Sequence, residues 1–237
     1  MSGTTEEKFY IFTNIGKCYC IDAAKFEENK EGNLSNFLKL EENEEIIASY
    51  DNSKINEIAY VATKFGLIKK IAKSEILAIK KNKNYITLQE YDSVINVVFT
   101  NDNTEKVCMG SKNGNIVIFD GATISCTKLP SKGILGMKVD ILVDEVVTMN
   151  IVNETHTQLC TITTTGYIKR TSLEEYPVTL RGTKGRLAHK YNNDNLIEIV
   201  PISNSDYICN SNVFGEIPIS TIPEASRTSR GIDILKM

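Results

Sequence analysis

Five glycines recur along this 237-residue chain at almost constant intervals. They lie 50, 48, 52 and 49 residues apart, at Gly16, Gly66, Gly114, Gly166 and Gly215. A small polar residue stands three positions before each glycine, and a cysteine or isoleucine stands two positions after it. A period of about 50 residues that holds over the whole chain indicates one supersecondary unit copied five times. Such periods are typical of propeller blades and solenoid arrays, in which each unit packs on its neighbours.

Each unit carries two β-rich runs around its glycine, for example IAYVAT and LIKKI on either side of KFG in the second unit. Two such runs joined by a short glycine-containing loop predict a β-hairpin. A polar loop follows, and then two further apolar stretches separated by an acidic turn. We therefore expect an all-β fold with four short strands in each unit.

The repeats are expected to form one domain over residues 1–237. Their approximate bounds are 5–54, 55–102, 103–154, 155–203 and 204–237. The fifth repeat ends before its final strand. The last blade is therefore expected to be incomplete, or to be closed by the N-terminal strand.

Four of the six cysteines, Cys18, Cys108, Cys160 and Cys209, are predicted to be buried apolar side chains. Cys108, Cys160 and Cys209 occupy the repeat position that Tyr10 and Tyr60 hold in the first two units. A residue that alternates with tyrosine behaves as a core side chain. The sequence has no CxxC pair and only two histidines, in unrelated contexts, so neither a metal site nor a disulfide framework is expected.

Other functional signals are absent from the sequence. No GxxxxGK[ST] or GxGxxG motif occurs, so no nucleotide or other cofactor is expected in this chain. No His-centred triad is indicated either, so we expect no catalytic residue. No apolar run approaches the roughly 20 residues that span a bilayer, and the N-terminus lacks a signal core. The chain is therefore expected to be cytoplasmic, with no membrane partner.

The net charge of −3 conceals an uneven distribution. Residues 1–58 carry 6 basic and 12 acidic residues, whereas residues 59–106 carry 8 basic and 5 acidic ones. Charge on one face decides binding to a polyanion more than the total does.

Basic residues recur at similar positions of the repeats. The pairs Lys69–Lys70 and Lys169–Arg170 follow their glycines by three and four residues. The loops after the hairpins add Lys80, Lys81, Lys83, Lys128, Lys132, Arg181, Lys184, Arg186, Lys190, Arg227 and Arg230. In a ring of blades, equivalent positions lie at equal radius, so we predict that these side chains contact successive phosphates along one rim. For any single lysine, solvated surface is the alternative.

The repeats resemble the C-terminal domain of the A subunit of bacterial DNA gyrase and topoisomerase IV. The segments ATKFGLIKKIAKSEI, GSKNGNIVIF and TTTGYIKRTSLEEYPVTLRGTKG carry the resemblance, which covers essentially the whole chain. It implies a five-bladed β-pinwheel, a propeller-like disc whose blades exchange strands and whose basic rim bends double-stranded DNA without reading its sequence. It also implies two protein partners, an N-terminal breakage-reunion domain that cleaves DNA and a B subunit that hydrolyses ATP with Mg²⁺.

In gyrase, a Gln-Arg-Arg-Gly-Gly-Lys-Gly box in a blade loop is needed for wrapping DNA. The stretch most similar to it here, a degenerate box, is Thr179, Leu180, Arg181, Gly182, Thr183, Lys184 and Gly185. It lacks the leading Gln-Arg and has threonine for the middle glycine. Either the chain begins after a box-bearing blade, or its parent lacks a true box, as topoisomerase IV subunits do; we favour gyrase.

A different functional class also stays open, a β-propeller that serves as a protein-interaction platform without binding DNA. The negative net charge and the apolar positions in three blades would suit it. No WD dipeptide or kelch-like motif supports it.

Overall fold

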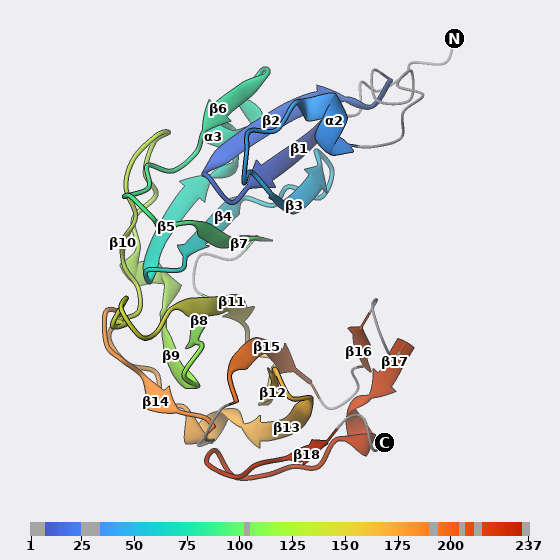
Figure 1. Cartoon of the computed structure of the whole chain (residues 1–237), viewed down its shortest axis with the longest axis vertical. Helices are drawn as coiled ribbons and strands as arrows, with labels where there is room; N and C mark the ends of the chain where they lie inside the picture. Colours follow the sequence, from blue (N-terminus) through green and yellow to red (C-terminus); the bar gives the residue numbers. More distant parts are fainter. Residues whose placement is uncertain are drawn as a thin grey trace. The chain divides into compact units, whose positions relative to one another are not determined.

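The computed structural model describes residues 8–24, 34–101, 105–189, 194–203, 207–210 and 215–233. These residues form four antiparallel four-stranded sheets and one two-stranded sheet (Figure 1). The predicted all-β fold is confirmed.

Every repeat begins with the predicted hairpin. The paired strands are β1 (Lys8–Thr13) with β2 (Lys17–Asp22), β4 (Ile58–Thr63) with β5 (Leu67–Ala72), β8 (Lys106–Ser111) with β9 (Asn115–Asp120), β12 (Gln158–Thr163) with β13 (Tyr167–Ser172), and β16 (Tyr207–Asn210) with β17 (Gly215–Pro218).

The hairpin turn explains the two residue types that define the repeat. Gly66 has a φ of +84°, which side chains other than that of glycine rarely allow. Its amide donates to the Thr63 carbonyl at 2.9 Å, and the Thr63 hydroxyl accepts from the amide of Leu67 at 3.3 Å. The small polar residue three positions before the glycine therefore caps the turn.

In the first four repeats, a third strand from the same repeat pairs with the first strand of the hairpin. These strands are β3 (Ile46–Asp51), β7 (Val94–Thr100), β11 (Val146–Val152) and β15 (Leu196–Ile202). Together with the hairpins they give the first, second, third and fourth sheets, in chain order.

The fourth strand of each sheet comes from the following repeat. These edge strands are β6 (Asn82–Asn84) on β2, β10 (Ile134–Leu135) on β5, β14 (Arg186–Leu187) on β9, and β18 (Ile232–Asp233) on β13. This exchange is the arrangement expected of a β-pinwheel. The fifth repeat contributes β18 to the fourth sheet, and its only other strands in the described residues are those of the β16–β17 hairpin. Residues 1–7 lie outside them, so closure by the N-terminal strand stays a prediction.

The position of the extra strand differs from the prediction. A strand is expected in the apolar stretch that opens FLKLEENEEIIASY, but the structure has helix α2 (Leu34–Leu38) there. Edge strand β6 lies instead in a polar loop, and the other three directly follow theirs. Two or three residues are too few to show a period-two pattern. Short helices also follow the later hairpins, namely α3 (Lys73–Leu77), η1 (Gly121–Thr123), η2 (Leu173–Glu175) and η3 (Ile219–Thr221). Among the described residues, no helix has the length and apolarity to cross a membrane.

The chain divides into two compact units, residues 1–103 with 124–134, and residues 104–123 with 135–237. In the first unit Phe12 packs edge-on against Tyr85, with ring centroids 5.2 Å apart. The second unit has its own cores, which contain Cys108 and Cys160. The single domain predicted over residues 1–237, with its repeat bounds, stays a prediction.

The prediction of buried cysteines is confirmed for Cys18, Cys108 and Cys160. Cys108 and Cys160, like Cys18 in the first unit, are free and fully buried, whereas Cys126, which lies outside the repeat positions of the prediction, is exposed. Burial raises the pKa of Cys160 to about 12, so its thiol stays protonated. The side chain of Cys209 lies outside the described residues.

Candidate nucleic-acid interface

Three loops lie in the same register against the second hairpin strand of three successive sheets. We call residues 127–133, 179–185 and 225–231 the crossing loops of the second, third and fourth sheets. The first amide of each loop donates to the carbonyl four residues after the repeat glycine. The pairs are Thr127 with Lys70 (3.0 Å), Thr179 with Ile118 (2.8 Å) and Ala225 with Arg170 (2.9 Å).

Each crossing loop ends in a glycine that lies against a strand. A Cβ added at Gly185 would come within 2.2 Å of the Ile116 carbonyl oxygen, and one at Gly231 within 2.4 Å of the Ile168 oxygen. Both glycines also have positive φ values, +79° and +78°. Gly133 makes the equivalent approach in the second sheet. Only glycine fits these positions without moving the loop.

The residue before each of these glycines is basic and exposed: Lys132, Lys184 and Arg230. The guanidinium carbon of Arg230 lies 3.9 Å from the centre of the Tyr167 ring, a cation–π distance. The crossing loops therefore bring one cation to the same position of three successive sheets.

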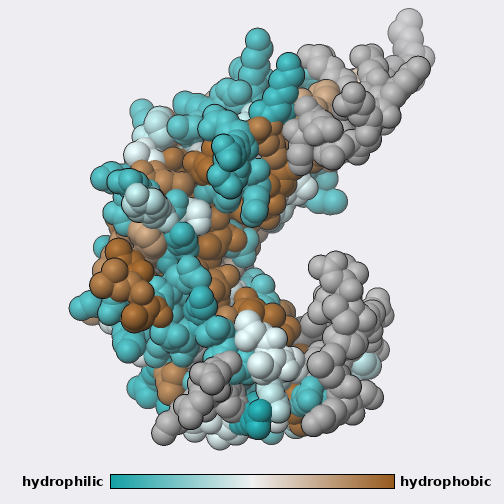
Figure 2. Space-filling model, in the orientation of Figure 1, coloured by the Kyte–Doolittle hydropathy of each residue, from teal (hydrophilic) through white to brown (hydrophobic). Residues whose placement is uncertain are grey.

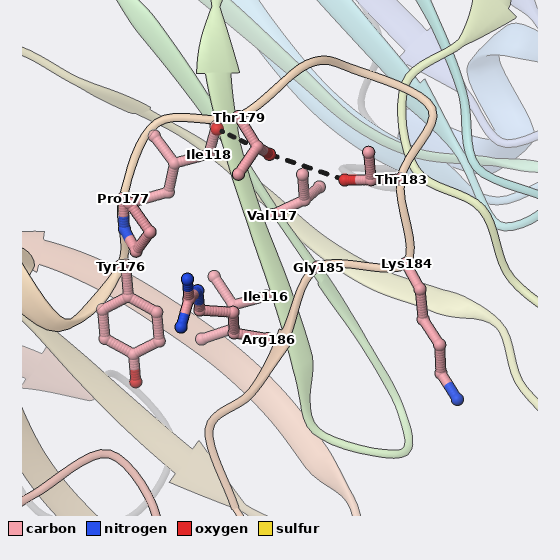
Figure 3. A pocket seen from close by; sticks show the side chains of 10 residues that line it. All are labelled: Ile116, Val117, Ile118, Tyr176, Pro177, Thr179, Thr183, Lys184, Gly185 and Arg186. Atoms are coloured by element: carbon pink, nitrogen blue, oxygen red, sulfur yellow. Dashed lines mark hydrogen bonds between the residues drawn. The ribbon is translucent and has the colours of Figure 1, made fainter.

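The degenerate box is the crossing loop of the third sheet (Figure 3). Its backbone pairs with residues 136–138. The Gly182 amide donates to the Gly136 carbonyl at 2.6 Å, and the Lys138 amide donates to the Thr183 carbonyl at 2.9 Å. The Arg181 guanidinium donates to the Leu135 carbonyl at 3.0 Å. We call these three contacts the backbone ladder of the box.

A cavity of about 240 Å³ lies under the box. Strand β9 forms its floor with Ile116, Val117 and Ile118. In Figure 3 the Lys184 side chain points away from Tyr176 and Arg186, which line the opposite side. The box thus carries its lysine on the outer side of the loop.

The surface around the box is mixed in character. Leu180 is 79% exposed, and Leu135 is 40% exposed. A hydrophobic patch lies beside the position of β10 at the left edge of Figure 2, among hydrophilic side chains. Leu180 stands where the gyrase box has an arginine, so this loop offers fewer cations than a complete box.

Lys69 and Lys169 do not lie on a rim, contrary to the prediction. Both are fully buried. Burial lowers the pKa of each ammonium group to about 8, so both are protonated at pH 7. The Lys69 ammonium donates to the carbonyls of Tyr85 (2.7 Å), Lys128 (3.1 Å) and Ser131 (3.2 Å). The Lys169 ammonium donates to those of Ala188 (2.8 Å), Ser226 (3.0 Å), Ser229 (2.9 Å) and Arg227.

The second members of the two pairs are also covered. Lys70 is buried, with its ammonium 5.3 Å from the centre of the Tyr60 ring. Arg170 is half-buried and donates from Nε to the Ile222 carbonyl at 2.6 Å. Alternation does send successive strand residues to opposite faces, but both faces are covered here. The strand pairs are therefore corrected from predicted phosphate contacts to internal groups.

Most of the loop cations are exposed as the prediction requires. These are Lys80, Lys81, Lys83, Lys128, Lys132, Arg181, Lys184, Arg186 and Arg230. Arg227 is half-buried, and its guanidinium donates to the Leu187 carbonyl. Lys190 lies outside the described residues. DNA contact by any of them stays a prediction.

Sequence reasoning missed the shared register of the crossing loops. The sequence does contain a signal for this register, since each crossing loop ends in a basic residue followed by glycine. An alignment on the hairpin glycines does not reveal it. Sequence reasoning also missed Tyr167 as the platform for Arg230. Within the described parts of the chain, no cluster of three or more His, Cys, Asp or Glu side chains could hold a metal ion.

The comparisons with known proteins agree with this architecture. The chain is 26% identical over 248 residues to the DNA gyrase A subunit of Staphylococcus epidermidis, which covers 99% of the chain and 28% of that relative. It is 25% identical over 271 residues to the DNA gyrase A subunit of Haemophilus influenzae, covering 98% and 31%. The chain thus spans less than a third of the length of these relatives.

Two solved structures share the fold. The C-terminal domain of DNA topoisomerase IV gives a TM-score of 0.83 at 20% identity, covering 97% of this chain and 75% of that one. The DNA gyrase A C-terminal domain gives 0.78 at 24% identity, covering 97% and 78%. The sequence model described as "DNA gyrase C-terminal domain, beta-propeller" matches residues 59–101, 105–153, 157–202 and 217–237. These matches cover well over half of the sequence, and the chain belongs to the DNA gyrase C-terminal domain family of β-propellers.

Proposed function

We propose that this chain binds double-stranded DNA through its crossing loops, without reading the base sequence. The observation that carries this proposal is the recurrence of an exposed cation before the loop glycine at Lys132, Lys184 and Arg230. Equivalent positions of successive sheets suit a ligand whose own charges repeat, which is the property of a phosphate backbone. Phosphate contacts fix the position of DNA and carry no sequence information.

The local backbone suits the same ligand. Gly182 leaves the box without a side chain two positions before Lys184, so phosphate oxygens can come close to the main chain there. Lys81 and Lys83 are exposed around β6, the edge strand of the first sheet, and extend the set of cations to another repeat.

We infer that the chain is the DNA-bending part of the A subunit of a bacterial type II topoisomerase, with gyrase favoured by the named relatives. In this proposal the other partners are the breakage-reunion domain and the B subunit, and the enzyme acts in the bacterial cytoplasm at the nucleoid. DNA cleavage and ATP hydrolysis with Mg²⁺ would belong to those other parts. This chain's own contribution would be binding energy and the path of the DNA.

The test is a titration of the affinity for a mixed-sequence DNA duplex against salt concentration. We expect the logarithm of the association constant to fall linearly with the logarithm of the salt concentration. The double variant Arg181→Ala/Lys184→Ala should lower this slope by roughly 1.8, since each lost phosphate contact removes about 0.9. Lys106, exposed at the start of β8 and outside the crossing loops, supplies the control Lys106→Ala.

Affinity that ignores ionic strength would refute the phosphate mechanism. Equal binding by the double variant and the Lys106 control would instead favour a protein-interaction platform.

A further inference from the structure

Two crossing loops are held from beneath by a buried ammonium group. Lys69 and Lys169 occupy the same repeat position, three residues after Gly66 and Gly166. An ammonium group has three hydrogens to donate and no acceptor. Each lysine directs them at backbone carbonyls of the loop that crosses its own sheet.

The captured carbonyls also recur in register. Counting from the first residue of the crossing loop, Lys69 takes the carbonyls one and four residues on, Lys128 and Ser131. Lys169 takes the carbonyls at the same two positions, Ser226 and Ser229, together with that of Arg227. The second and fourth sheets therefore share one arrangement, in which a buried lysine donates to the carbonyls one and four residues into the crossing loop.

Each lysine ties the crossing loop to a second segment. Lys69 also donates to Tyr85, and Lys169 to Ala188. These two residues are equivalent, because the amide of each donates to a hairpin glycine of the preceding repeat, Gly16 or Gly114. The ammonium group thus fastens the loop to the chain that leaves the neighbouring edge strand.

The third sheet lacks the lysine and uses another contact. Val117 occupies the position of Lys69 and Lys169 and is buried. The carbonyl four residues into its loop, that of Thr183, accepts from the amide of Lys138 instead. This carbonyl therefore has a donor in all three crossing loops.

We propose that Lys69 and Lys169 are positioning residues, which hold the crossing loops of the second and fourth sheets in the conformation that presents their cations to DNA. The presented side chains are Lys128 and Lys132 in one loop, and Arg230 in the other. This proposal rests on the proposed DNA-binding function. It separates two roles for lysine in one blade, an internal group that shapes the loop and an external group that meets the phosphate.

Loss of such a lysine should loosen the loop more than it unfolds the unit. A buried charge is weak evidence for global stability, because its desolvation offsets most of its attraction to the acceptors. In Lys169→Met the carbonyls of Ala188, Arg227 and Ser229 lose the ammonium donor, whereas the Ser226 carbonyl keeps the amide and hydroxyl of Ser229. The loop can relax toward water to satisfy the carbonyls that lose it. The strands beneath keep their ladder hydrogen bonds.

The experiment combines amide hydrogen exchange with DNA affinity, both on the 237-residue chain. In Lys169→Met we expect amides of residues 225–231 to exchange about tenfold faster, the equivalent of roughly 1.4 kcal/mol of local stability. Amides of β12 and of the box, residues 179–185, should exchange as before. DNA affinity should fall by at most about tenfold, in proportion to the fraction of chains whose loop is open and must be ordered again on binding. The salt slope should stay unchanged because the same phosphates are contacted.

Two further variants make the result decisive. Arg230→Met removes a proposed phosphate contact, so it should lower the salt slope by about 0.9 and leave exchange unaltered. Lys69→Met repeats the test in the other unit, on residues 127–133, in case Lys169→Met does not fold.

Three results would overturn the proposal. These are unchanged exchange in the loop, faster exchange throughout the unit, and a reduced salt slope in Lys169→Met, which would mark a direct contact. A wild-type chain without salt-dependent affinity would refute the DNA-binding function itself, and the exchange data would still decide whether the lysine holds its loop.

Discussion

The crossing loops of the third and fourth sheets have the same path and different anchors. Over the fourth sheet, the buried Lys169 ammonium collects the loop carbonyls. Over the third, Val117 lines a cavity at the equivalent position, and the backbone ladder with residues 135–138 holds the loop. The common requirements are the terminal glycine and a donor for the carbonyl four residues into the loop. The anchor itself is free to change between repeats.

The largest effect should come from the shared glycine. Gly185→Ala and Gly231→Ala should each destabilise the chain by about 3 kcal/mol or more, because a Cβ meets a strand carbonyl and positive φ is strained for alanine. Gly182→Ala is the matched control. It has a φ of +76° and no heavy atom closer than 3.4 Å to the added Cβ, so only the strain of about 1 kcal/mol remains.

Urea denaturation of the three glycine variants measures these differences. If Gly185→Ala and Gly182→Ala prove equally stable, the close approach to Ile116 is not a constraint, and the loops need not share a path.

A second contrast concerns the segment that leaves each edge strand. His189 is the counterpart of Ile86 in the first unit, and its Nε2 lies 2.6 Å from the Thr161 hydroxyl. Burial, with a smaller contribution from Lys169, lowers the pKa of His189 to about 4. Between pH 6.5 and 4 the unfolded chain therefore binds a proton that the folded chain does not. The free energy of unfolding should fall by up to about 3 kcal/mol as the pH drops through this range.

Denaturation at several pH values, for the wild type and His189→Ile, checks this contribution. The variant should lose the part of the pH dependence that lies between 6.5 and 4. An unaltered profile would mean that another group titrates there.

Exchanging the anchors gives a smaller effect. Val117→Lys should destabilise the chain by about 2 kcal/mol, since the Thr183 carbonyl already accepts from Lys138 and the new ammonium is buried with too few acceptors. Val117→Met, which adds volume without charge, should cost less than about 1.5 kcal/mol. Thermal unfolding of both variants measures the difference. A fully stable Val117→Lys would show that either anchor serves either sheet.

The smallest stability changes should come from the exposed cations. Lys132→Ala, Lys184→Ala and Arg230→Ala should each stay within about 0.5 kcal/mol of the wild type, as surface substitutions do. In salt titrations each should lower the slope by a similar amount, about 0.9. Unequal slopes would show that equivalent loop positions do not contact equivalent phosphates.

The sequence predicts the hairpins well because their determinants are local. A glycine with positive φ and a capping hydroxyl three residues earlier occur together, and both are visible in the letters. The edge strands could not be predicted, because β14 and β18 have two residues each and pair with another repeat. Long-range pairing decides such strands, and no local periodicity reports it.

The buried lysines show a different limit. Two consecutive basic residues in a strand suggest surface, because an isolated charge is costly to bury. The compensation at Lys69 comes from the carbonyls of Lys128 and Ser131, about 60 residues further along the chain. The sequence does carry one sign that Lys69 and Lys169 are buried. Val117 holds the same position in the third repeat, and an apolar residue there indicates an internal position.

The exchange of edge strands has a consequence for how such a chain can be cut or enlarged. The boundaries of the sequence repeat and of the sheet differ, since each four-stranded sheet is completed by residues of the next copy. Excising the residues after 203 would therefore damage the fourth sheet as well, by removing β18 and the carbonyls around Lys169. Loss of the last copy leaves β13 as an open edge, whereas an internal copy can be removed whole, because the edge strand of the next copy takes the same place. In a molecule of this kind the evolutionary module and the folding module have different boundaries.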